Sequence, residues 1–315
     1  MKNVTLTING KTLSVPSGTT VFDAARSLGV EIPALCHHES LPVVSACRLC
    51  LVEVEGSRKL QTSCSLLATD GMKVQTETPR LIKYRRAILQ LLLDSHPNDC
   101  LTCQKAGECL LQKYAYQYGV TFREHDGARR PAQTDLSSPY IVKDDSKCIL
   151  CGRCVRTCDQ VEKERQVLAF AGRGYATRIV ADDDKTLETS KCVSCNRCVS
   201  LCPVGALLDR RIMGKVRPWE AEVRVKECRS CDYGCHFDVY YKDGKAVAVK
   251  ARAPEPGRPL CLRGRLMTEL LWLERPDTPW RKIGGKFVKA SWVKVLGLQR
   301  LIDKMELLDA PGDRQ

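Results

Sequence analysis

The sequence predicts an α+β protein made of several small domains, each built around a group of cysteines. Three observations support this. The chain has 315 residues, a length typical of two or more domains. Its 19 cysteines fall into five groups with metal-ligand spacing, and none is left over. Alternating, strand-like runs and one long helical pattern separate the groups. The cysteines therefore decide what kind of protein this is.

The first cysteine group lies in a predicted β-rich domain. Alternating runs in residues 3–15 meet at Asn9-Gly10, the strongest short hairpin signal, and Thr20 is a good start for a short helix. A strand-like segment follows at residues 72–78. The four cysteines in loops are Cys36, Cys47, Cys50 and Cys64. This order resembles the β-grasp fold of plant-type ferredoxins around a [2Fe-2S] cluster, although C-x10-C-x2-C-x13-C departs from their spacing. Four thiolates would also suit zinc.

A histidine and three cysteines follow a predicted helix. Thr78 and Pro79 are suited to its N-cap and first turn, and apolar residues recur every three or four positions to about Ser95. The next group is His96, Cys100, Cys103 and Cys109. It lacks a fourth thiolate, which the histidine can replace; imidazole removes a negative charge and should raise the potential of a cluster. The histidines expected to be structural are His37, His38, His125 and His236. We expect residues 110–140 to be a polar connector.

Two runs of C-x2-C-x2-C-x3-C dominate the middle of the chain. This is the signature of a two-cluster bacterial-type ferredoxin, in which the fourth cysteine of each run ligates the other cluster. One [4Fe-4S] cluster is therefore assigned to Cys148, Cys151, Cys154 and Cys202, and the other to Cys158, Cys192, Cys195 and Cys198. Zinc remains an alternative that this pattern disfavours, because four ligands satisfy a zinc ion and these runs supply eight interlocked ones. We expect the insert between the runs to be a turn and a solvated acidic loop at residues 182–184.

The last cysteine group is Cys228, Cys231, Cys235 and Cys261. Between its third and fourth members, two alternating runs meet at Asp243-Gly244, which predicts a hairpin that returns the final ligand. The small β-rich [4Fe-4S] domain is followed by a tail from Trp280 with an amphipathic stretch between Trp292 and Leu308. This stretch either packs against the body or docks a partner.

The order of these sites resembles the large iron-sulfur subunit of respiratory complex I, the alpha subunits of NAD-linked formate dehydrogenases, and the iron-sulfur subunits of NAD-linked and electron-bifurcating hydrogenases and transhydrogenases. The resemblance covers nearly the whole chain, and four different spacings occur in the family's order. It implies one [2Fe-2S] cluster, four [4Fe-4S] clusters, and a flavin only in a partner subunit. The partners it implies are an NAD(P)(H)-binding flavoprotein, a small thioredoxin-like [2Fe-2S] subunit, a hydrogenase, transhydrogenase or formate dehydrogenase catalytic subunit, and ferredoxin.

The chain also departs from this family. It reaches only Gln315, so we expect neither a molybdopterin domain nor an H-cluster domain, and we find no dinucleotide, P-loop or Ser-His-Asp motif. A complete second [4Fe-4S] set argues against complex I, which usually keeps one cluster there. The expectation is a non-catalytic electron relay in an NAD(P)-linked, electron-bifurcating complex. Two alternatives remain: the iron-sulfur subunit of a formate dehydrogenase with a separately encoded molybdenum subunit, and a zinc-rich interaction protein.

The formal net charge of +13 invites a nucleic-acid interpretation, but it counts cysteines as neutral. Metal-bound cysteines are thiolates, and with five cluster cores the holoprotein would carry about +4. Basic residues beside the ligands then offset cluster charge: Arg48, Lys105, Lys147, Arg153, Lys191, Arg197, Arg229 and Arg263. We therefore expect no nucleic-acid partner. The start of the chain does not resemble a secretion signal and no apolar run is long enough for a membrane span, so the reducing cytoplasm is expected. The predicted domains are residues 1–78, 79–136, 137–212, 213–275 and 276–315.

Overall fold

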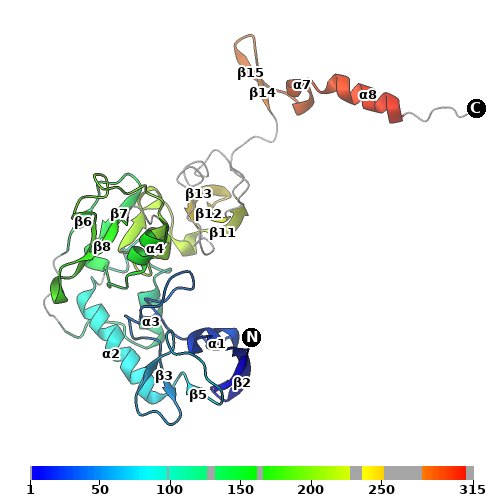
Figure 1. The fold of residues 1–315 in the computed structure, drawn as a ribbon. Coiled ribbons are helices and arrows are strands. Elements are labelled where there is room, and N and C mark those ends of the chain that lie inside the picture. The colour runs from blue at the N-terminus through cyan, green and yellow to red at the C-terminus, as the bar shows by residue number, and fades with distance from the viewer. Residues whose placement is uncertain are drawn as a thin grey trace, which may run out of the picture. The chain divides into compact units, whose positions relative to one another are not determined.

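The computed structural model describes residues 2–97, 99–125, 132–161, 166–227, 236–251 and 279–309. The chain divides into two compact units, Met1–Leu266 and Met267–Gln315 (Figure 1). Both mix helices and strands. The first unit contains four of the five sheets found in the described residues, and its range includes all 19 cysteines of the sequence.

The chain begins with a five-stranded sheet. Its strands, in the order β2-β1-β5-β3-β4, are β1 (Asn3–Ile8), β2 (Lys11–Pro16), β3 (Leu51–Val54), β4 (Gln61–Thr62) and β5 (Lys73–Gln75). The predicted hairpin turn is present, with positive φ at both Asn9 and Gly10. Helix α1 (Val21–Ser27) begins at Thr20, whose side chain accepts a hydrogen bond from the backbone N–H of Asp23. The β1–β2 hairpin, α1 and the late strand agree with the sequence analysis.

Two helices follow this sheet and contact one another (Figure 1): α2 (Pro79–Ser95) and α3 (Leu110–Gln117). The Thr78 side chain caps α2 as predicted. The prediction of a polar connector was wrong for α3. Leu111, Tyr114 and Ala115 recur at helical spacing and are buried in the core. This buried face includes Tyr114, and the polar residues around it made the apolar pattern hard to recognise in the sequence.

The region of the two long cysteine runs is a small sheet with two short helices and a hairpin. The sheet has the order β10-β7-β6, and the elements are β6 (Thr134–Asp135), β7 (Ile141–Asp144), α4 (Arg153–Val161), β8 (Leu168–Ala171), β9 (Arg178–Ala181), α5 (Arg197–Leu201) and β10 (Leu207–Asp209). The insert is more ordered than predicted, because β8 and β9 pair as a hairpin whose Ile179 and Val180 are buried. Asp183 and Asp184 are exposed, as expected for an acidic loop.

One hydrophobic core runs through most of the first unit. It includes Leu35 and Leu49 from the first cysteine loop, Leu89 of α2, and Ile141 and Val204 from the later sheet region. A second core, around Leu6, Ile8 and Val21, lies inside the first sheet. The cysteine loops of three predicted domains are therefore packed into one body and are held in fixed relation by side-chain contacts.

The first unit ends with the sheet β11-β12-β13, made of β11 (Glu222–Glu227), β12 (His236–Lys242) and β13 (Lys245–Ala251). The predicted hairpin turns at Asp243-Gly244. Tyr240 and Ala248 from this sheet share a small core with Ile212 and Val216.

The second unit contains the hairpin β14 (Trp280–Ile283) and β15 (Lys286–Lys289), then α7 (Trp292–Leu296) and α8 (Gln299–Asp309). The predicted amphipathic stretch is divided in two by Gly297, which has positive φ. Of the helices in the described residues, none combines the length and apolarity needed to cross a membrane.

Candidate metal centres

The first four predicted ligands converge beside the five-stranded sheet. Cys36, Cys50 and Cys64 are almost fully buried. The Cys50 thiol lies 3.3 Å from the Cys64 sulfur, and the backbone N–H of Cys47 donates to Cys36 Sγ at 3.4 Å. Hydrogen bonding from Cys47 lowers the pKa of the Cys36 thiol to about 5. N–H groups that point at sulfur favour the thiolate, the form that binds iron.

A buried arginine fixes this cysteine loop from outside. Arg85, on α2, has no exposed surface and donates from Nε to the Leu49 carbonyl at 3.1 Å and from Nη2 to the Leu51 carbonyl at 2.9 Å. Its Nη1 pairs with Glu77 at 2.7 Å. The two carbonyls flank Cys50, so α2 holds this cysteine in place. No sequence pattern indicates this role, because in the sequence Arg85 is only one of several basic residues in a predicted helix.

His96 follows the last residue of α2, and its two ring nitrogens have different surroundings. Its Nδ1 is 2.9 Å from the Pro97 carbonyl; a carbonyl can only accept, so Nδ1 carries the proton. Nε2 is buried and has no hydrogen-bond partner within the described part of the chain. Burial also lowers the pKa of His96, which keeps the ring neutral. A neutral imidazole held through Nδ1 with a bare Nε2 suits a metal ligand.

The three cysteines that follow lie close enough to interact. Burial raises the pKa of Cys109 to about 11, and the charges of Cys103 and Cys100 add to this rise. Cys103 is buried and Cys100 is exposed. A Cβ placed on Gly205 would lie 2.8 Å from Cys103 Sγ, so the loop after Cys202 passes directly over this sulfur.

The two long runs form two separate cavities. One is lined by Cys148, Cys151, Cys154 and Cys202, with apolar neighbours that include Ile179 and Val204. The other is lined by Cys158, Cys192, Cys195 and Cys198, with Val167 and Leu187 among its neighbours. Each cavity takes three cysteines from one run and the last cysteine of the other, the arrangement expected from the crossover. Apolar walls with four sulfurs fit a [4Fe-4S] cluster.

Burial dominates the electrostatics of these cavities. It raises the pKa of Cys151 to about 12, and the neighbouring Cys202 adds to the shift. Iron binding must therefore displace the thiol protons.

Within the described residues, no three or more His, Cys, Asp or Glu side chains gather closely enough to hold a single metal ion. The fifth predicted set, Cys228, Cys231, Cys235 and Cys261, lies outside the described residues.

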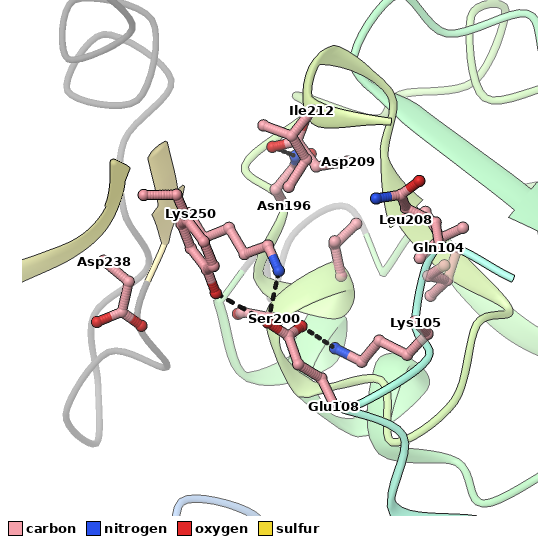
Figure 2. Close-up of a pocket in the computed structure, with 13 residues that line it drawn as sticks. Gln104, Lys105, Glu108, Asn196, Ser200, Leu208, Asp209, Ile212, Asp238 and Lys250 are labelled. Carbon is pink, nitrogen blue, oxygen red and sulfur yellow. Dashed lines mark hydrogen bonds and ion pairs between the residues drawn. The ribbon is translucent and has the colours of Figure 1, made fainter. Parts of the chain in front are cut away.

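A further cavity of about 230 Å³ lies between the 104–108 loop, residues 196–212 and the sheet β11-β12-β13. Lys250 and Lys105 both point toward Glu108 there (Figure 2). Glu108 accepts hydrogen bonds from Lys250 Nζ at 2.6 Å and from the Tyr240 hydroxyl at 2.8 Å. These contacts attach the sheet β11-β12-β13 beside Cys109. No sequence pattern singles out Glu108.

Four family descriptions match consecutive parts of the chain. A 2Fe-2S iron-sulfur cluster binding domain matches residues 1–79, and the NADH-ubiquinone oxidoreductase-G iron-sulfur binding region matches residues 85–124. A 4Fe-4S dicluster domain matches residues 147–206, and the molybdopterin oxidoreductase Fe4S4 domain matches residues 225–271. Fold and sites thus define a class: a multidomain protein that contains both [2Fe-2S] and [4Fe-4S] binding domains.

Relatives then identify the family. A G-type subunit of the NADH-quinone oxidoreductase of Rhizobium meliloti (strain 1021) is 36% identical over 92% of this chain and 34% of its own length. The HndD subunit of the NADP-reducing hydrogenase of Solidesulfovibrio fructosivorans is 40% identical over 69% of this chain and 38% of its own length. The alpha subunit of the NADPH-Fe(3+) oxidoreductase of Geobacter sulfurreducens (strain ATCC 51573 / DSM 12127 / PCA) is 34% identical over 93% and 34%, respectively. The chain thus spans about a third of the length of these relatives.

A solved structure adds the fold. A chain in the crystal structure of NAD+-reducing [NiFe]-hydrogenase in the H2-reduced state is 34% identical, with a TM-score of 0.63, over 68% of this chain and 90% of that chain. The protein belongs to the family of iron-sulfur proteins that resemble the G-type subunit of complex I, a family that includes subunits of NAD(P)-linked hydrogenases. The family resemblance drawn from the sequence is confirmed.

Proposed function

We propose that this chain is a non-catalytic electron-transfer subunit of an NAD(P)-linked oxidoreductase complex. The observation that carries the proposal is the pair of four-cysteine cavities in the same core as the first cysteine loop. Iron-sulfur clusters bound there would accept and release single electrons at potentials that depend on ligand, charge and burial. The chain's own residues supply thiolates, exclude water with apolar walls and fix the spacing between sites.

We assign twenty ligands to five clusters. The [2Fe-2S] site takes Cys36, Cys47, Cys50 and Cys64. The [4Fe-4S] sites take His96 with Cys100, Cys103 and Cys109; Cys148, Cys151, Cys154 and Cys202; Cys158, Cys192, Cys195 and Cys198; and Cys228, Cys231, Cys235 and Cys261. The convergence of the first group, the bare Nε2 of His96 and the two cavities support the first four sets. The family match to residues 225–271 supports the fifth.

The domain assignments follow the same division. Residues 1–78 are assigned a β-grasp ferredoxin fold, residues 79–136 a helical domain, residues 137–212 a bacterial-type ferredoxin fold, and residues 213–275 a small β-rich domain. Residues 276–315 are a C-terminal tail, in which the hairpin β14–β15 precedes the predicted helical part. The sheet β2-β1-β5-β3-β4 and the matched families support this division. The use of so many cysteines as ligands favours a reducing cytoplasm.

The names of the relatives support partners that handle NAD(P)(H). We infer a flavoprotein subunit that exchanges hydride with NAD(H) or NADP(H), a small thioredoxin-like [2Fe-2S] subunit and a hydrogenase or transhydrogenase module, with ferredoxin as a further partner and electron bifurcation at the flavin. The hydrogenase relatives favour the hydrogenase module. The molybdopterin oxidoreductase match favours a second candidate, a formate dehydrogenase whose molybdenum subunit is a separate chain.

The test is the metal and cofactor content of the complex purified without oxygen through a tag on this chain. Five clusters correspond to about 18 iron and 18 sulfide per chain. Nickel would identify a nickel-iron hydrogenase partner, and molybdenum or tungsten would identify the formate dehydrogenase alternative. Iron with flavin and neither metal would favour a transhydrogenase or an iron-only hydrogenase on another chain. Zinc in place of iron would contradict the electron-transfer proposal.

A further inference from the structure

Two arginines on α4 connect the first cysteine loop with the loop of the Cys148 site. Arg156 Nη2 donates to the backbone carbonyl of Cys36 at 2.6 Å and to that of Cys151 at 3.3 Å. One nitrogen atom thus touches a proposed [2Fe-2S] ligand and a proposed [4Fe-4S] ligand. The same side chain bonds the Gly152 carbonyl through Nε at 3.2 Å and the Pro42 carbonyl through Nη1.

Arg153 makes a parallel connection deeper in the protein. Its Nη2 donates to the His37 carbonyl at 2.5 Å and to the Ala34 carbonyl at 3.4 Å, on either side of Cys36. Its Nη1 is 3.5 Å from the carbonyl of Leu201, the residue before Cys202. Arg156 therefore spans the two cysteine loops, and Arg153 links the first cysteine loop to the end of α5, directly before Cys202.

The Arg153 charge lacks an acidic partner of the usual kind. The residue is 5% exposed. Among the residues that the structure describes, its Nε has no hydrogen-bond partner and no carboxylate forms an ion pair with it. A buried charge of this kind is costly unless opposite charge lies near. Four thiolates bound to a cluster carry more negative charge than its iron-sulfide core offsets. Arg153 and Arg156 therefore place positive charge against two sites that would be anionic once clusters are bound.

We propose that Arg153 and Arg156 are positioning residues that lock the [2Fe-2S] loop to the Cys148 cluster loop and hold the reduction potentials of both clusters up. The inference rests on the proposed function. Reduction adds negative charge to a cluster, and a fixed positive charge between two clusters favours that step at both. Hydrogen bonds to carbonyls of both loops keep the clusters at a constant separation.

The experiment is an EPR-monitored redox titration of the anaerobically purified holoprotein with Arg153→Gln or Arg156→Gln. Glutamine removes the charge and keeps an amide donor. The midpoint potentials of the [2Fe-2S] cluster and the Cys148 cluster should both fall. The relaxation enhancement of the reduced [2Fe-2S] signal by its reduced neighbour should weaken, because it depends on the distance between them.

Three comparison variants separate charge from position. Arg173→Gln makes the same charge change at an exposed residue of the same region and should move neither potential. Arg85→Gln removes a guanidinium that bonds only the [2Fe-2S] loop among the cysteine loops and should lower that potential alone. Arg156→Lys keeps the positive charge but lacks the several N–H donors of the guanidinium. The midpoint potentials of both clusters should be retained, and the relaxation enhancement of the [2Fe-2S] signal should be lost. This variant also serves if a glutamine variant fails to fold.

Iron and sulfide are quantified first. A wild-type protein without clusters would refute the proposed function itself. Clusters at full content whose potentials stay unchanged in both glutamine variants, or shift at only one of the two sites, would overturn the present inference and leave the proposed function standing. So would an equal shift of both potentials in Arg173→Gln.

Discussion

The two ring nitrogens of His96 differ in a way that suits the proposed ligand role. Because Nδ1 donates to the Pro97 carbonyl, Nε2 is left bare and buried. Replacing His96 by cysteine would put a thiolate where a neutral ring stood, which should lower the reduction potential of the site. An EPR-monitored redox titration measures this. The matched control is His125→Cys, since His125 pairs with Asp94 at an exposed position and should leave every cluster potential unchanged. An unchanged titration of His96→Cys would remove His96 from the ligand set.

Gly205 is needed for space and not for backbone conformation, because its φ is ordinary and its added Cβ would meet Cys103 Sγ. Gly205→Ala must push that sulfur away or shift the loop. We expect loss of about four iron per chain and of the EPR signal of the histidine-containing site, with the other signals retained. Gly119→Ala is the control: the space there is open, so only a backbone cost of about 1 kcal/mol arises. Full iron content in Gly205→Ala would contradict the close approach.

The grouping of the cysteines was predictable where it is encoded in local spacing. The crossed assignment of the two cysteine runs follows from local spacing, and the structure lines two cavities with those sets. The arginines were not predictable in the same way. Arg85 bonds a carbonyl 36 residues away and Arg156 one 120 residues away, and no local pattern encodes such a contact. Arg153 stood out only as a basic neighbour of a ligand.

Among the helices and strands, those with local start and stop signals were predicted well. The Asn9-Gly10 and Asp243-Gly244 hairpins and the Thr78 cap of α2 depend on turn and cap chemistry that a few neighbouring residues supply. Helix α3 was missed because its buried face uses tyrosine, and its N-cap residue, Cys109, makes no side-chain cap hydrogen bond. Its stability depends on the shared core, which is tertiary information.

Helix α2 should depend more on Arg85 than on its own N-cap. Arg85→Met leaves the Leu49 and Leu51 carbonyls without their donor and removes the bond to Glu77. This should lower the free energy of unfolding by about 3 kcal/mol. Thr78→Ala, which removes the cap of the same helix, should cost only about 1 kcal/mol. The temperature at which the holoprotein loses visible cluster absorbance ranks the variants. Equal midpoints would show that Arg85 does not hold the cysteine loop.

At the scale of the whole molecule, the order of motifs was enough to predict the family, because four spacings in sequence narrow the choice strongly. The shared core was not predictable. Leu35, Leu89 and Ile141 read as members of three domains, yet they belong to one packed cluster. Which apolar faces meet is decided by packing between segments far apart in sequence. The consequence is that three proposed cluster regions share one hydrophobic core.

The charge of the whole molecule provides a test of its redox character. The bare chain has a formal charge of +13 and a sequence pI of about 9.0. With cysteines ligated to five oxidised clusters, the net charge falls to about +4. The holoprotein should therefore have a lower isoelectric point than the cluster-free chain in anaerobic native isoelectric focusing. Four-cysteine zinc sites would lower the charge similarly, so this first shift alone shows only ligation.

Reduction separates the two cases. One electron per cluster lowers the net charge by up to about five further units. Treatment with a strong reductant should therefore shift the isoelectric point of the holoprotein again to lower pH. Zinc has no redox chemistry and allows no such second shift. The control is the same protein after iron removal by a chelator, which should focus at one position with and without reductant. A holoprotein band whose position does not change after reduction would contradict an electron-transfer role for the chain.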